Sequence, residues 1–501
     1  MSSSRYPWNG WSKVRSTLIP QPMISSPARP CFKPGVPHWR GRSRLKDGKT
    51  IEELERIFHP RGVVVVGASN SDGNLGRFFL EGFIQLGFEN LYVVHPSEQE
   101  VQRVKAYTTV REISGEVDLA VVFSPRETVP QIVRECALKG IKGVVICTSG
   151  FGEKDMEGRR LEQEVVEIAR RNGTRLIGPN CVGIYCPSAR LANFGFLPKE
   201  SGPVGMFSQS GSLSIMFIIA AAAQGIRFSK VVSCGNECDL NAADFLAYLG
   251  QDPETSIILT YLEGVKEGRR FCQLAREISE EKPIIVWKGG ATEVGARAAA
   301  SHTGALSGSA AVWRAVFKQT GMIKVDSEEE MLDYLQAFYF LPLPRGNRVA
   351  IASGMGGLGV ATADACIESG LELAQLSAHT RKRLEDIVPT VGTCTDNPVD
   401  LGMASIFNPQ LYIDTIEALG KDDQVDMLLI TSGSWKSDYM ERVLAVVREV
   451  EKPIVFITTP ALKTVMEEPL PTKGIAFYPD GRRAVMALSN MVAYQRFRSG
   501  D

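Results

Sequence analysis

His302 lies in a run of small residues, 295–308, which follows an apolar segment ending in two glycines, 283–290. The apolar segment predicts a buried strand that opens into a turn. Small residues offer little surface to bury, so we expect the run that follows to be a loop that can move. A neutral imidazole near pH 7 can attack phosphorus or carbon. His302 is therefore a candidate nucleophile, although most histidines on loops are solvated and inert.

A serine-rich turn and a glutamate are expected at the same sheet edge as this histidine. The turn, 208–212, follows a predicted strand and opens an apolar helix, so its hydroxyls and free amides can bind an anion. Its candidate phosphate-binding residues are Ser208, Ser210, Gly211 and Ser212. Glu263 lies at the end of the third predicted strand of the second expected domain, 181–344, where its carboxylate can fix the tautomer of an imidazole. N-capping and solvation explain each residue separately, but they explain the combination less well.

Length and composition place the chain among multidomain globular proteins. It has 501 residues, 44% of them hydrophobic and 23% charged, so about three domains are expected. The formal net charge of −1 provides no basic field for nucleic acid. No apolar stretch is long enough to span a membrane. The ten cysteines are scattered without metal-ligand spacing, so we expect reduced thiols, no metal site and a cytoplasmic location.

From Ile51 onward, β-branched runs alternate with helix-length amphipathic stretches, which is typical of parallel sheets with crossover helices. We expect an α/β fold of three consecutive doubly wound domains, 51–180, 181–344 and 345–501, after a disordered basic tail, 1–50. The predicted strands are 61–67, 91–95, 117–123, 143–147 and 175–180 in the first domain; 204–207, 228–233, 257–261, 284–287 and 323–325 in the second; and 348–353, 371–376, 425–430 and 453–457 in the third.

Two glycine-rich turns are candidate cofactor loops. The turn 67–76 lets backbone amides approach a phosphate at a helix N-terminus. A dinucleotide-binding unit places an acid at the end of its second strand, but here that strand ends in His95-Pro96-Ser97. This argues against NAD and for another nucleotide-tailed cofactor. The second turn, 354–359, matches GxGxxG, and we attribute its glycines to tight packing of helix on strand.

Several segments together resemble the NDP-forming acyl-CoA synthetases, which include the ADP-forming acetyl-CoA synthetases and, more distantly, the succinyl-CoA synthetase alpha subunit. The segments are 178–183, 208–211, 233–236 with Asp239 and Asp244, 301–308 and 397–401. The resemblance runs from about Ile51 to the C-terminus. It implies a Rossmann-like CoA-binding domain followed by two flavodoxin-like ligase-CoA domains.

The resemblance also implies residue roles. His302 is the expected phosphohistidine, Glu263 its orienting partner, and Ser210, Gly211 and Ser212 the holders of the phosphoryl group. The residues expected to bind coenzyme A are Gly67, Ala68, Ser69, Asn70, Leu75, Gly76, Pro96, Thr148 and Ser149. The implied reaction converts an acyl-CoA, ADP and phosphate reversibly into a carboxylic acid, CoA and ATP.

None of the three expected domains is the nucleotide-binding domain of this family. The resemblance therefore implies a hetero-oligomer in which a separate ATP-grasp beta-type subunit holds ADP or ATP and Mg²⁺. The sequence departs from the family at three places. His95-Pro96-Ser97 replaces a usual Asn-Pro-Lys, Ile215 stands where succinate enzymes carry a tyrosine, and Gly354-Met355 departs from Asn-Ala-Gly-Gly. An uncharged acyl group is expected from Ile215. A non-catalytic CoA-binding regulator is the alternative function, and an NAD-dependent oxidoreductase is disfavoured by both second-strand ends.

Overall fold

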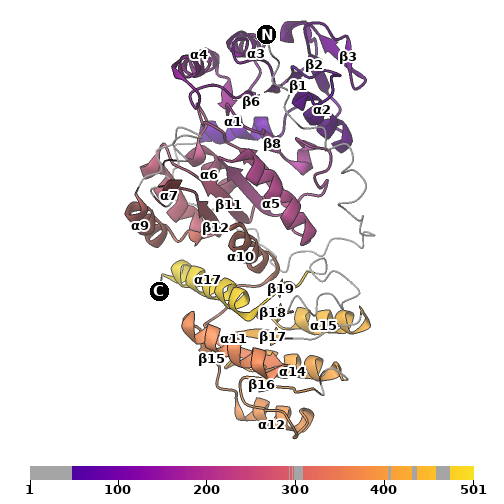
Figure 1. Cartoon of the computed structure of the whole chain (residues 1–501), viewed down its shortest axis with the longest axis vertical. Coiled ribbons are helices and arrows are strands. Elements are labelled where there is room, and N and C mark those ends of the chain that lie inside the picture. Colours follow the sequence, from indigo (N-terminus) through magenta and orange to yellow (C-terminus); the bar gives the residue numbers. More distant parts are fainter. Residues whose placement is uncertain are drawn as a thin grey trace.

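The computed structural model describes residues 48–290, 309–403, 408–431, 437–458 and 474–500, together with 292, 294, 295, 297 and 405. His302 and the basic segment 1–47 lie outside the described residues. The described part forms three sheets that follow one another along the long axis of the molecule (Figure 1). The α/β fold class expected from the sequence is confirmed. None of the described helices is both long enough and apolar enough to cross a bilayer.

The first sheet has the order β3-β4-β2-β1-β5-β6-β7. From β4 onward this is the strand order of a Rossmann fold, 3-2-1-4-5-6, and all of these pairs are parallel. The strands are β1 (Val63–Val66), β2 (Leu91–Val94), β3 (Glu100–Val101), β4 (Val104–Tyr107), β5 (Leu119–Val122), β6 (Gly143–Ile146) and β7 (Arg175–Ile177). The helices are α1 (Gly48–Phe58), α2 (Leu75–Leu86), α3 (Val129–Lys139) and α4 (Met156–Asn172), with a short 3₁₀ turn at Val110–Glu112.

Helix α1 includes residues 48–50, which we had expected in the disordered tail. Its Leu54, Ile57 and Phe58 are buried, so the apolar face of the helix packs into the core between the first and second sheets. The β3–β4 hairpin was not predicted. Its strands are short and carry exposed charged residues, so the two-residue alternation that reveals a strand in a sequence is too brief to detect.

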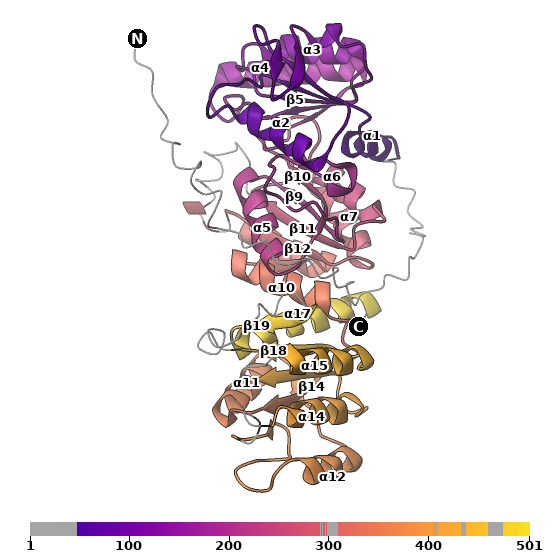
Figure 2. The same cartoon turned by 90° about the vertical axis from the view of Figure 1, so that its right-hand side faces the viewer.

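The second sheet has the order β13-β12-β11-β9-β10-β8. Its five parallel strands follow the flavodoxin order, and β8 joins β10 as an antiparallel edge strand. The strands are β8 (Ile184–Tyr185), β9 (Val204–Ser208), β10 (Phe228–Ser233), β11 (Ile257–Leu262), β12 (Ile284–Lys288) and β13 (Ile323–Val325). The helices are α5 (Gly211–Ala223), α6 (Ala242–Gln251), α7 (Gly268–Ser279), α9 (Ala310–Thr320) and α10 (Glu328–Phe340), with a short 3₁₀ turn at Pro187–Ala189. Figure 2 shows α5 on one face of the sheet and α6 and α7 on the other.

The third sheet repeats the flavodoxin order as β15-β14-β17-β18-β19. Its strands are β14 (Arg348–Ser353), β15 (Glu372–Leu373), β16 (Val399–Asp400), β17 (Met427–Thr431), β18 (Ile454–Ile457) and β19 (Ala476–Tyr478). The helices are α11 (Gly356–Glu368), α12 (Ala378–Ile387), α14 (Gln410–Gly420), α15 (Ser437–Glu449) and α17 (Gly481–Ser499).

Strand β15 is much shorter than the predicted strand 371–376, and Asn397 is the reason. Its side-chain amide donates to the carbonyls of Val349 (2.8 Å) and Ala374 (3.0 Å) and accepts the Ile351 N–H (2.9 Å). Between β14 and the residue after β15, the Asn397 side chain thus forms hydrogen bonds that main-chain groups would form in a longer strand. Strand β16 then pairs with the last two residues of β14.

Helices α10 and α17 join the second and third sheets (Figure 1). Arg483 of α17 makes a bidentate pair with the buried Asp333 of α10, at 2.6 and 2.8 Å. The apolar residues around this pair form one continuous core that includes Met206 of β9 and Val349 of β14. The second and third sheets therefore share this core, in addition to a core between the first and second sheets and one within the third.

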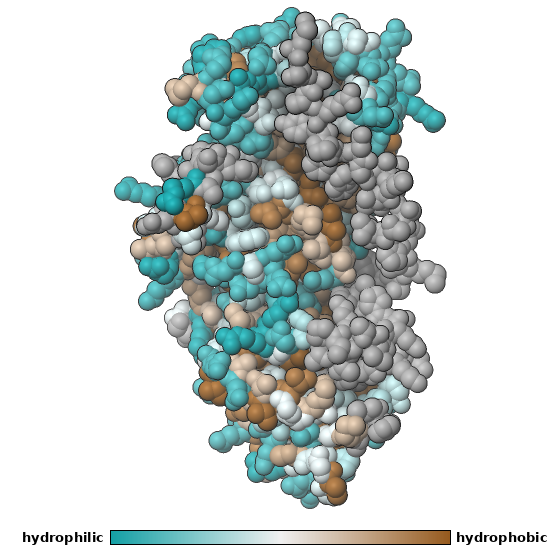
Figure 3. Space-filling model, in the orientation of Figure 1, coloured by the Kyte–Doolittle hydropathy of each residue, from teal (hydrophilic) through white to brown (hydrophobic). Residues whose placement is uncertain are grey.

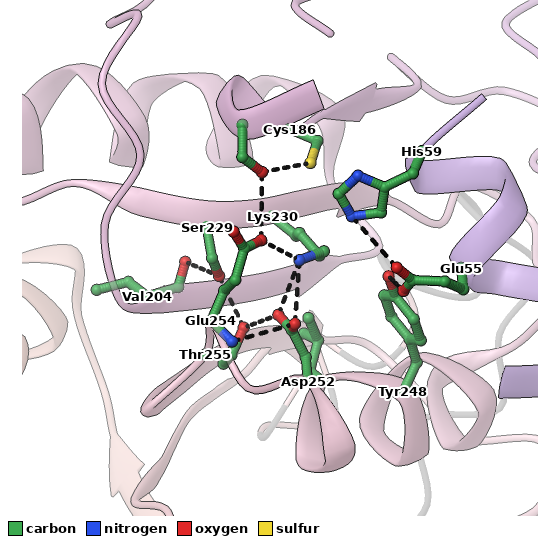
Figure 4. A network of polar contacts seen from close by, with 12 residues as sticks. Glu55, His59, Cys186, Val204, Ser229, Lys230, Tyr248, Asp252, Glu254 and Thr255 are labelled. Atoms are coloured by element: carbon green, nitrogen blue, oxygen red, sulfur yellow. Dashed lines mark hydrogen bonds and ion pairs between the residues drawn. The ribbon is translucent and has the colours of Figure 1, made fainter. Parts of the chain in front are cut away.

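A buried ionic network lies where the strands of the second sheet begin (Figure 4). Lys230 is 1% exposed, and its Nζ pairs with Asp252 (3.0 Å) and Glu254 (2.6 Å). Beside it, Tyr248 of α6 donates to Glu55 of α1 at 2.7 Å. Because a buried ammonium is costly unless it is paired, these carboxylates are required by the fold. The network occupies the edge of the sheet where the strands begin. A ligand is therefore expected at the opposite edge, where the strands end.

Candidate functional site

The carboxyl ends of β9 and β11 meet at the topological switch point of the second sheet. In a sheet of this order, the connections after the first and third parallel strands leave toward opposite faces, which opens a crevice between them. The predicted serine turn follows β9, and Glu263 follows β11. The structure therefore brings these two candidate elements together. His302 cannot be placed, because it lies outside the described residues.

The serine turn is held by its own hydroxyls. The Ser208 Oγ donates to the Ser210 carbonyl (2.7 Å) and accepts the Ser210 N–H (3.1 Å). Ser210 is the N-cap of α5, and its Oγ lies 3.5 Å from Leu213 N and from Ser212 Oγ. Ser208 is buried, Ser210 and Gly211 are half-buried, and Ser212 is exposed. The turn therefore presents two hydroxyls and a helix N-terminus, which suits an anion.

Gln209 fastens the serine turn to the loop that carries Glu263. Its Oε1 accepts the N–H groups of Glu263 (2.5 Å) and Gly264 (3.1 Å), and its Nε2 donates to the Gly264 carbonyl (2.9 Å). The Gln209 N–H also donates to the Tyr261 carbonyl at 3.1 Å. Gln209 is 7% exposed. One side chain thus satisfies three polar groups of the neighbouring loop and fixes where Glu263 leaves β11.

Glu263 is 5% exposed, and Tyr261 donates to its Oε1 at 3.3 Å. Burial and the nearby Glu263 charge raise the pKa of Tyr261 to about 12, so this tyrosine remains a hydrogen-bond donor throughout the neutral range. A buried carboxylate at the end of a strand is a group that can orient an imidazole by accepting a ring N–H.

Glu237, in the loop after β10, is a second buried carboxyl beside this site. It is 2% exposed, and neither carboxyl oxygen accepts a hydrogen bond from the described residues. Burial raises its pKa to about 7, against smaller lowering effects of Gln209 and Lys266. Lys266 donates to the carbonyls of Asn236 (3.0 Å) and Glu237 (2.7 Å), which anchors this loop to the one after β11.

The predicted CoA-binding residues gather where the strands of the first sheet end. Gly67 has φ +90°, and a Cβ there would lie 3.1 Å from the Phe123 carbonyl carbon. A Cβ on Gly76 would lie 2.9 Å from the Ala68 Cα, so α2 packs directly on the turn. Only glycine allows both approaches. The helix N-terminus is thereby brought against the end of β1.

The polar side chains of this turn have defined partners. Asn74 caps α2 by accepting the Arg77 N–H (2.9 Å), and it also accepts the Ser69 N–H (3.3 Å). The Asn70 amide donates to the Glu100 carbonyl of the β3–β4 hairpin at 2.8 Å. Asn70 therefore holds the hairpin against the turn. Leu75 and Ser149 are exposed at the same edge.

His95 has a structural role at the end of β2. Its Nδ1 accepts the N–H groups of Ser97 (3.3 Å) and Glu98 (3.1 Å), which closes the turn around Pro96. This leaves Nε2 as the ring nitrogen free to carry a proton. Pro96 is exposed beside it. The imidazole thus supplies the turn-closing acceptor that an asparagine side chain gives in such turns.

Asn236 connects the edge of the first sheet to that of the second. Its amide donates to Glu153 (2.6 Å) and Glu162 (3.0 Å), two acids of the first sheet's last crossover. Glu153 in turn accepts the Gly150 N–H at 2.5 Å. On the same loop, Thr148 donates to the Ser124 carbonyl (2.7 Å) and accepts the Asn180 N–H on its own carbonyl (3.0 Å). The loop with Thr148 and Ser149 is therefore fixed relative to the second sheet.

Across the described residues, no group of three or more acidic, histidine or cysteine side chains is arranged to hold a metal ion.

Comparison with known proteins decides the family. A CoA binding domain model matches 61–187, a succinyl-CoA ligase like flavodoxin domain 201–338, and a Ligase-CoA domain 349–458. The alpha subunit of acetate–CoA ligase [ADP-forming] II from Pyrococcus furiosus is 42% identical over 410 residues, which cover 80% of this chain and 89% of that subunit. The chain belongs to the ADP-forming acyl-CoA ligases. As an alpha-type chain of this family it is part of an acid–thiol ligase, as the sequence resemblance predicted.

Two further members of the family show how its parts are distributed. Acetate–CoA ligase [ADP-forming] I from Archaeoglobus fulgidus is 36% identical, and the match covers 89% of this chain but 64% of that protein. The structure also matches dinucleotide forming acetyl-coenzyme A synthetase 1 from Ca. Korarchaeum cryptofilum in complex with phosphate and ADP. That match has a TM-score of 0.82 at 34% identity and covers 89% of this chain and 97% of that one. CoA and a nucleotide are thus ligands within the family.

Sequence reasoning did not identify Gln209 or Glu237 as site residues. Gln209 lies inside the serine motif, and its position between two hydroxyls was the available signal. The sequence around Glu237 gave no signal, because its place in the site depends on burial beside loops that are distant in the sequence.

Proposed function

We propose that this chain carries a transient phosphoryl group on His302 during the reversible conversion of an acyl-CoA, ADP and phosphate into a carboxylic acid, CoA and ATP. One observation carries the proposal. Gln209 fastens the serine turn to Glu263 at the switch point of the second sheet. The segment that leads to His302 leaves the same sheet edge after β12. An anion site and an orienting carboxylate therefore flank the expected position of the imidazole.

The proposed reaction has three displacements. A phosphate oxygen attacks the acyl carbonyl carbon, and the CoA thiolate leaves, which gives an acyl phosphate. A ring nitrogen of His302 then attacks phosphorus, and the carboxylate leaves with the electrons of the P–O bond. Finally the terminal oxygen of ADP takes the phosphoryl group from His302. Splitting the transfer through a covalent intermediate divides one difficult step into easier ones.

The chain's own residues have distinct roles in this proposal. Glu263 accepts the N–H of one His302 nitrogen, which keeps the other nitrogen unprotonated for attack. Ser210 and Ser212 donate their hydroxyls to the phosphoryl oxygens, and Gly211 leaves room at the N-terminus of α5. Ser208 shapes the turn through its two hydrogen bonds to Ser210. Preorganised donors of this kind stabilise charge as it develops.

Coenzyme A is proposed to lie along the edge of the first sheet. The residues that would contact it are Gly67, Ala68, Ser69, Asn70, Leu75, Gly76, Pro96, Thr148 and Ser149. They fit the group because the glycines bring backbone amides and the N-terminus of α2 to one place, where phosphates bind favourably. The bridge through Asn236 supports a shared reaction space between this edge and the serine turn.

A separate ATP-grasp beta-type subunit is proposed to bind ADP or ATP with Mg²⁺ and to form a hetero-oligomer with this chain. The proposal is supported by the longer Archaeoglobus fulgidus relative, of which the match covers 64%, and by the alpha subunit of Pyrococcus furiosus, of which the match covers 89%. Bound Mg²⁺ would neutralise charge on the transferred phosphoryl group.

An uncharged acyl group is proposed as the substrate. Ile215 is half-buried on α5, and Met216 and Ile219 of the same helix are 53% and 37% exposed. Figure 3 shows hydrophobic surface gathered around the middle of the molecule, at the height of this helix. An apolar surface offers no partner to a second carboxylate, so activity is expected with short, branched or aryl monocarboxylic acids and not with succinate.

The experiment that tests the phosphohistidine is a labelling assay. The full chain is purified with the ATP-grasp beta-type subunit and incubated with [γ-³²P]ATP and Mg²⁺. Label that is labile in acid and stable in base should appear on the wild-type chain and be lost in His302→Ala. Absence of label on the wild-type chain, or equal label on the variant, would overturn the proposal and favour a CoA-binding protein without catalysis.

A further inference from the structure

Lys288 is a buried cation at the end of β12, the strand that precedes the segment containing His302. It is 5% exposed, and its register partner in β11 is Leu262, the residue before Glu263. The ordinary explanation for such a lysine is a structural tether. Its polar contacts with the described residues, however, lie on the three pieces of chain that surround the proposed phosphoryl-transfer site.

The Lys288 ammonium reaches each of these pieces. Its Nζ donates to the Glu263 carbonyl at 2.8 Å and to the Gly289 carbonyl. It also lies 5.4 Å from the ring centroid of Trp313, in the first turn of α9. Gly289 begins the connection toward His302, and α9 is the next described helix after it. One side chain thus links the orienting glutamate to both ends of that connection.

The surroundings of Gly289 leave little freedom at this joint. Its N–H donates to the Leu262 carbonyl at 2.9 Å, and a Cβ on it would lie 2.5 Å from the Tyr261 hydroxyl oxygen. That same tyrosine donates to Glu263. The start of the connection is therefore packed against the residue that holds the Glu263 carboxylate, and a shift at either place would be felt at the other.

From this geometry we propose that Lys288 is a positioning residue for phosphoryl transfer, which sets the main chain of Glu263 and the point from which the His302 segment departs. The inference rests on the proposed function. It assigns to Lys288 no contact with substrate. Its effect should appear in the rate of phosphorylation of His302 and not in the binding of CoA.

The role needs the protonated form of the side chain. An ammonium has three N–H donors and no acceptor, so it can serve two carbonyls and face a ring. A neutral amine turns a lone pair toward one of these groups. Burial lowers the pKa of Lys288 to about 8, and among the described residues the Glu263 charge opposes this shift. Positioning is therefore expected to weaken as the pH rises through 8.

Lys282 provides a matched control within the same strand region. It is half-buried, its pKa is likewise lowered to about 8 by burial, and it also donates to two main-chain carbonyls, those of Leu249 (3.0 Å) and Asp252 (2.8 Å). It differs in lying before β12, at the edge of the sheet opposite the serine turn. A purely structural loss should affect both lysines alike.

The test compares Lys288→Met, Lys288→Arg and Lys282→Met in the complex with the ATP-grasp beta-type subunit. Phosphorylation rates from [γ-³²P]ATP are measured by rapid quench between pH 6.5 and 9.5. The wild type and Lys282→Met should show rates that fall through an apparent pKa near 8. Lys288→Met should be 10- to 100-fold slower and lack this fall, with CoA affinity within twofold of the wild type. Lys288→Arg should recover part of the rate and keep it at pH 9.5, because arginine stays charged.

The outcomes separate the two proposals. If the wild type and Lys282→Met are labelled and Lys288→Met is labelled at the same rate with the same pH profile, the positioning role is wrong while the phosphohistidine stands. The role is equally wrong if Lys282→Met slows labelling as much as Lys288→Met does. Absence of label on the wild type would overturn the proposed function and, with it, this inference.

Discussion

The second and third sheets contain the same turn at the end of their first parallel strand. In the second sheet, the Ser208 hydroxyl donates to the Ser210 carbonyl (2.7 Å) and accepts the Ser210 N–H (3.1 Å). Ser353 does the same toward Met355, with the same two distances. The two turns differ at their second and third positions, where Gln209 and Ser210 correspond to Gly354 and Met355.

This difference shows how one scaffold supports two kinds of site. Gln209 reaches across to the next loop, whereas the space beside Gly354 is filled by Tyr412, whose hydroxyl donates to the Thr431 carbonyl at 3.1 Å. Ser210 gives α5 a hydroxyl cap, but Met355 gives α11 no side-chain cap. The shared serine turn is therefore a property of the fold, and polar chemistry comes from the two residues after the serine.

The largest effect is expected from Gln209→Ala. The change leaves the Glu263 N–H, the Gly264 N–H and the Gly264 carbonyl without their partner, and Gln209 is nearly buried. Unpaired buried groups cost about 1–3 kcal/mol each, so the free energy of unfolding should fall by about 2–5 kcal/mol. Phosphohistidine labelling should fall at least about tenfold, since each 1.4 kcal/mol lost from positioning is a factor of ten.

Gln336 is the control for that experiment. It is similarly buried and accepts the Phe477 N–H at 2.5 Å, but it lies on α10, between the second and third sheets. Gln336→Ala should lower stability without changing the labelling rate of the folded fraction. If both variants reduce labelling equally, the contrast between the two turns does not explain catalysis.

Glu237→Gln should produce the next largest effect, and one that depends on pH. The folded protein raises the pKa of this carboxyl from 4.5 to about 7, so ionising it costs stability that grows above pH 4.5 and levels off above pH 7. In the third sheet, β15 corresponds to β10, and the residue that follows it is the buried, uncharged Ala374. Replacing Glu237 should therefore stabilise the protein by up to about 3 kcal/mol at pH 8 and far less at pH 5.

Chemical denaturation at these two pH values measures the Glu237 effect. Glu267, whose side chain is 48% exposed and pairs with Arg270 at 2.8 Å, supplies the control Glu267→Gln. Its change should be small and similar at both pH values. An equal gain for Glu237→Gln at pH 5 and pH 8 would show that ionisation of this carboxyl is not the cause.

A moderate loss of stability is expected from Gly354→Ala. A Cβ at this position would lie 2.3 Å from the Tyr412 hydroxyl oxygen and 2.4 Å from the Ser405 hydroxyl oxygen. Overpacking of this kind costs about 1–3 kcal/mol, measurable as a lower unfolding midpoint. Gly357→Ala, three residues on with no atom within 4 Å of its added Cβ, should be neutral or slightly stabilising. Two equal effects would show that Tyr412 does not fill the space that Gln209 uses in the second sheet.

Met355→Ser should give the smallest effect. It should make the turn after β14 in the third sheet resemble the serine turn after β9 in the second. Met355 is the N-cap of α11 in an extended conformation, with φ −131° and ψ 96°, which a capping serine also adopts. A hydroxyl there should raise the free energy of unfolding by about 0.5–1 kcal/mol, seen as a small rise in Tm. No gain, while Ser210→Ala loses about 1 kcal/mol, would mean that the two helix starts differ in more than their caps.

Much of the fold could be predicted from the sequence because its central strands are short, largely apolar runs that are buried on both faces. The runs at β1, β9 and β14 are of this kind, and their alternation with helices fixed the fold class. Some of the edge strands were missed or were predicted with other bounds. Strand β8 has two residues, and β15 is cut short by the Asn397 amide, so both depend on contacts with distant parts of the chain.

The site divides in the same way. Ser208, Ser210 and Glu263 were predicted to lie together because strand ends in a parallel sheet share an edge, and the structure brings the serine turn and Glu263 together there. The linking residues were missed. Gln209 acts on residues more than fifty positions away, and the raised pKa of Glu237 and the lowered pKa of Lys288 come from desolvation, which a sequence does not display.

The core shared by the second and third sheets has a consequence for how the chain can be divided. The proline-rich link at 341–346 reads in the sequence as a boundary, yet Leu341 is itself 5% exposed and belongs to the same core as Tyr334 of α10 and Leu488 of α17. Cutting there would expose apolar surface on both fragments, so we expect each piece to be less stable alone than when bound to the other. A chain divided at this link would therefore need its two pieces to bind each other again through α10 and α17.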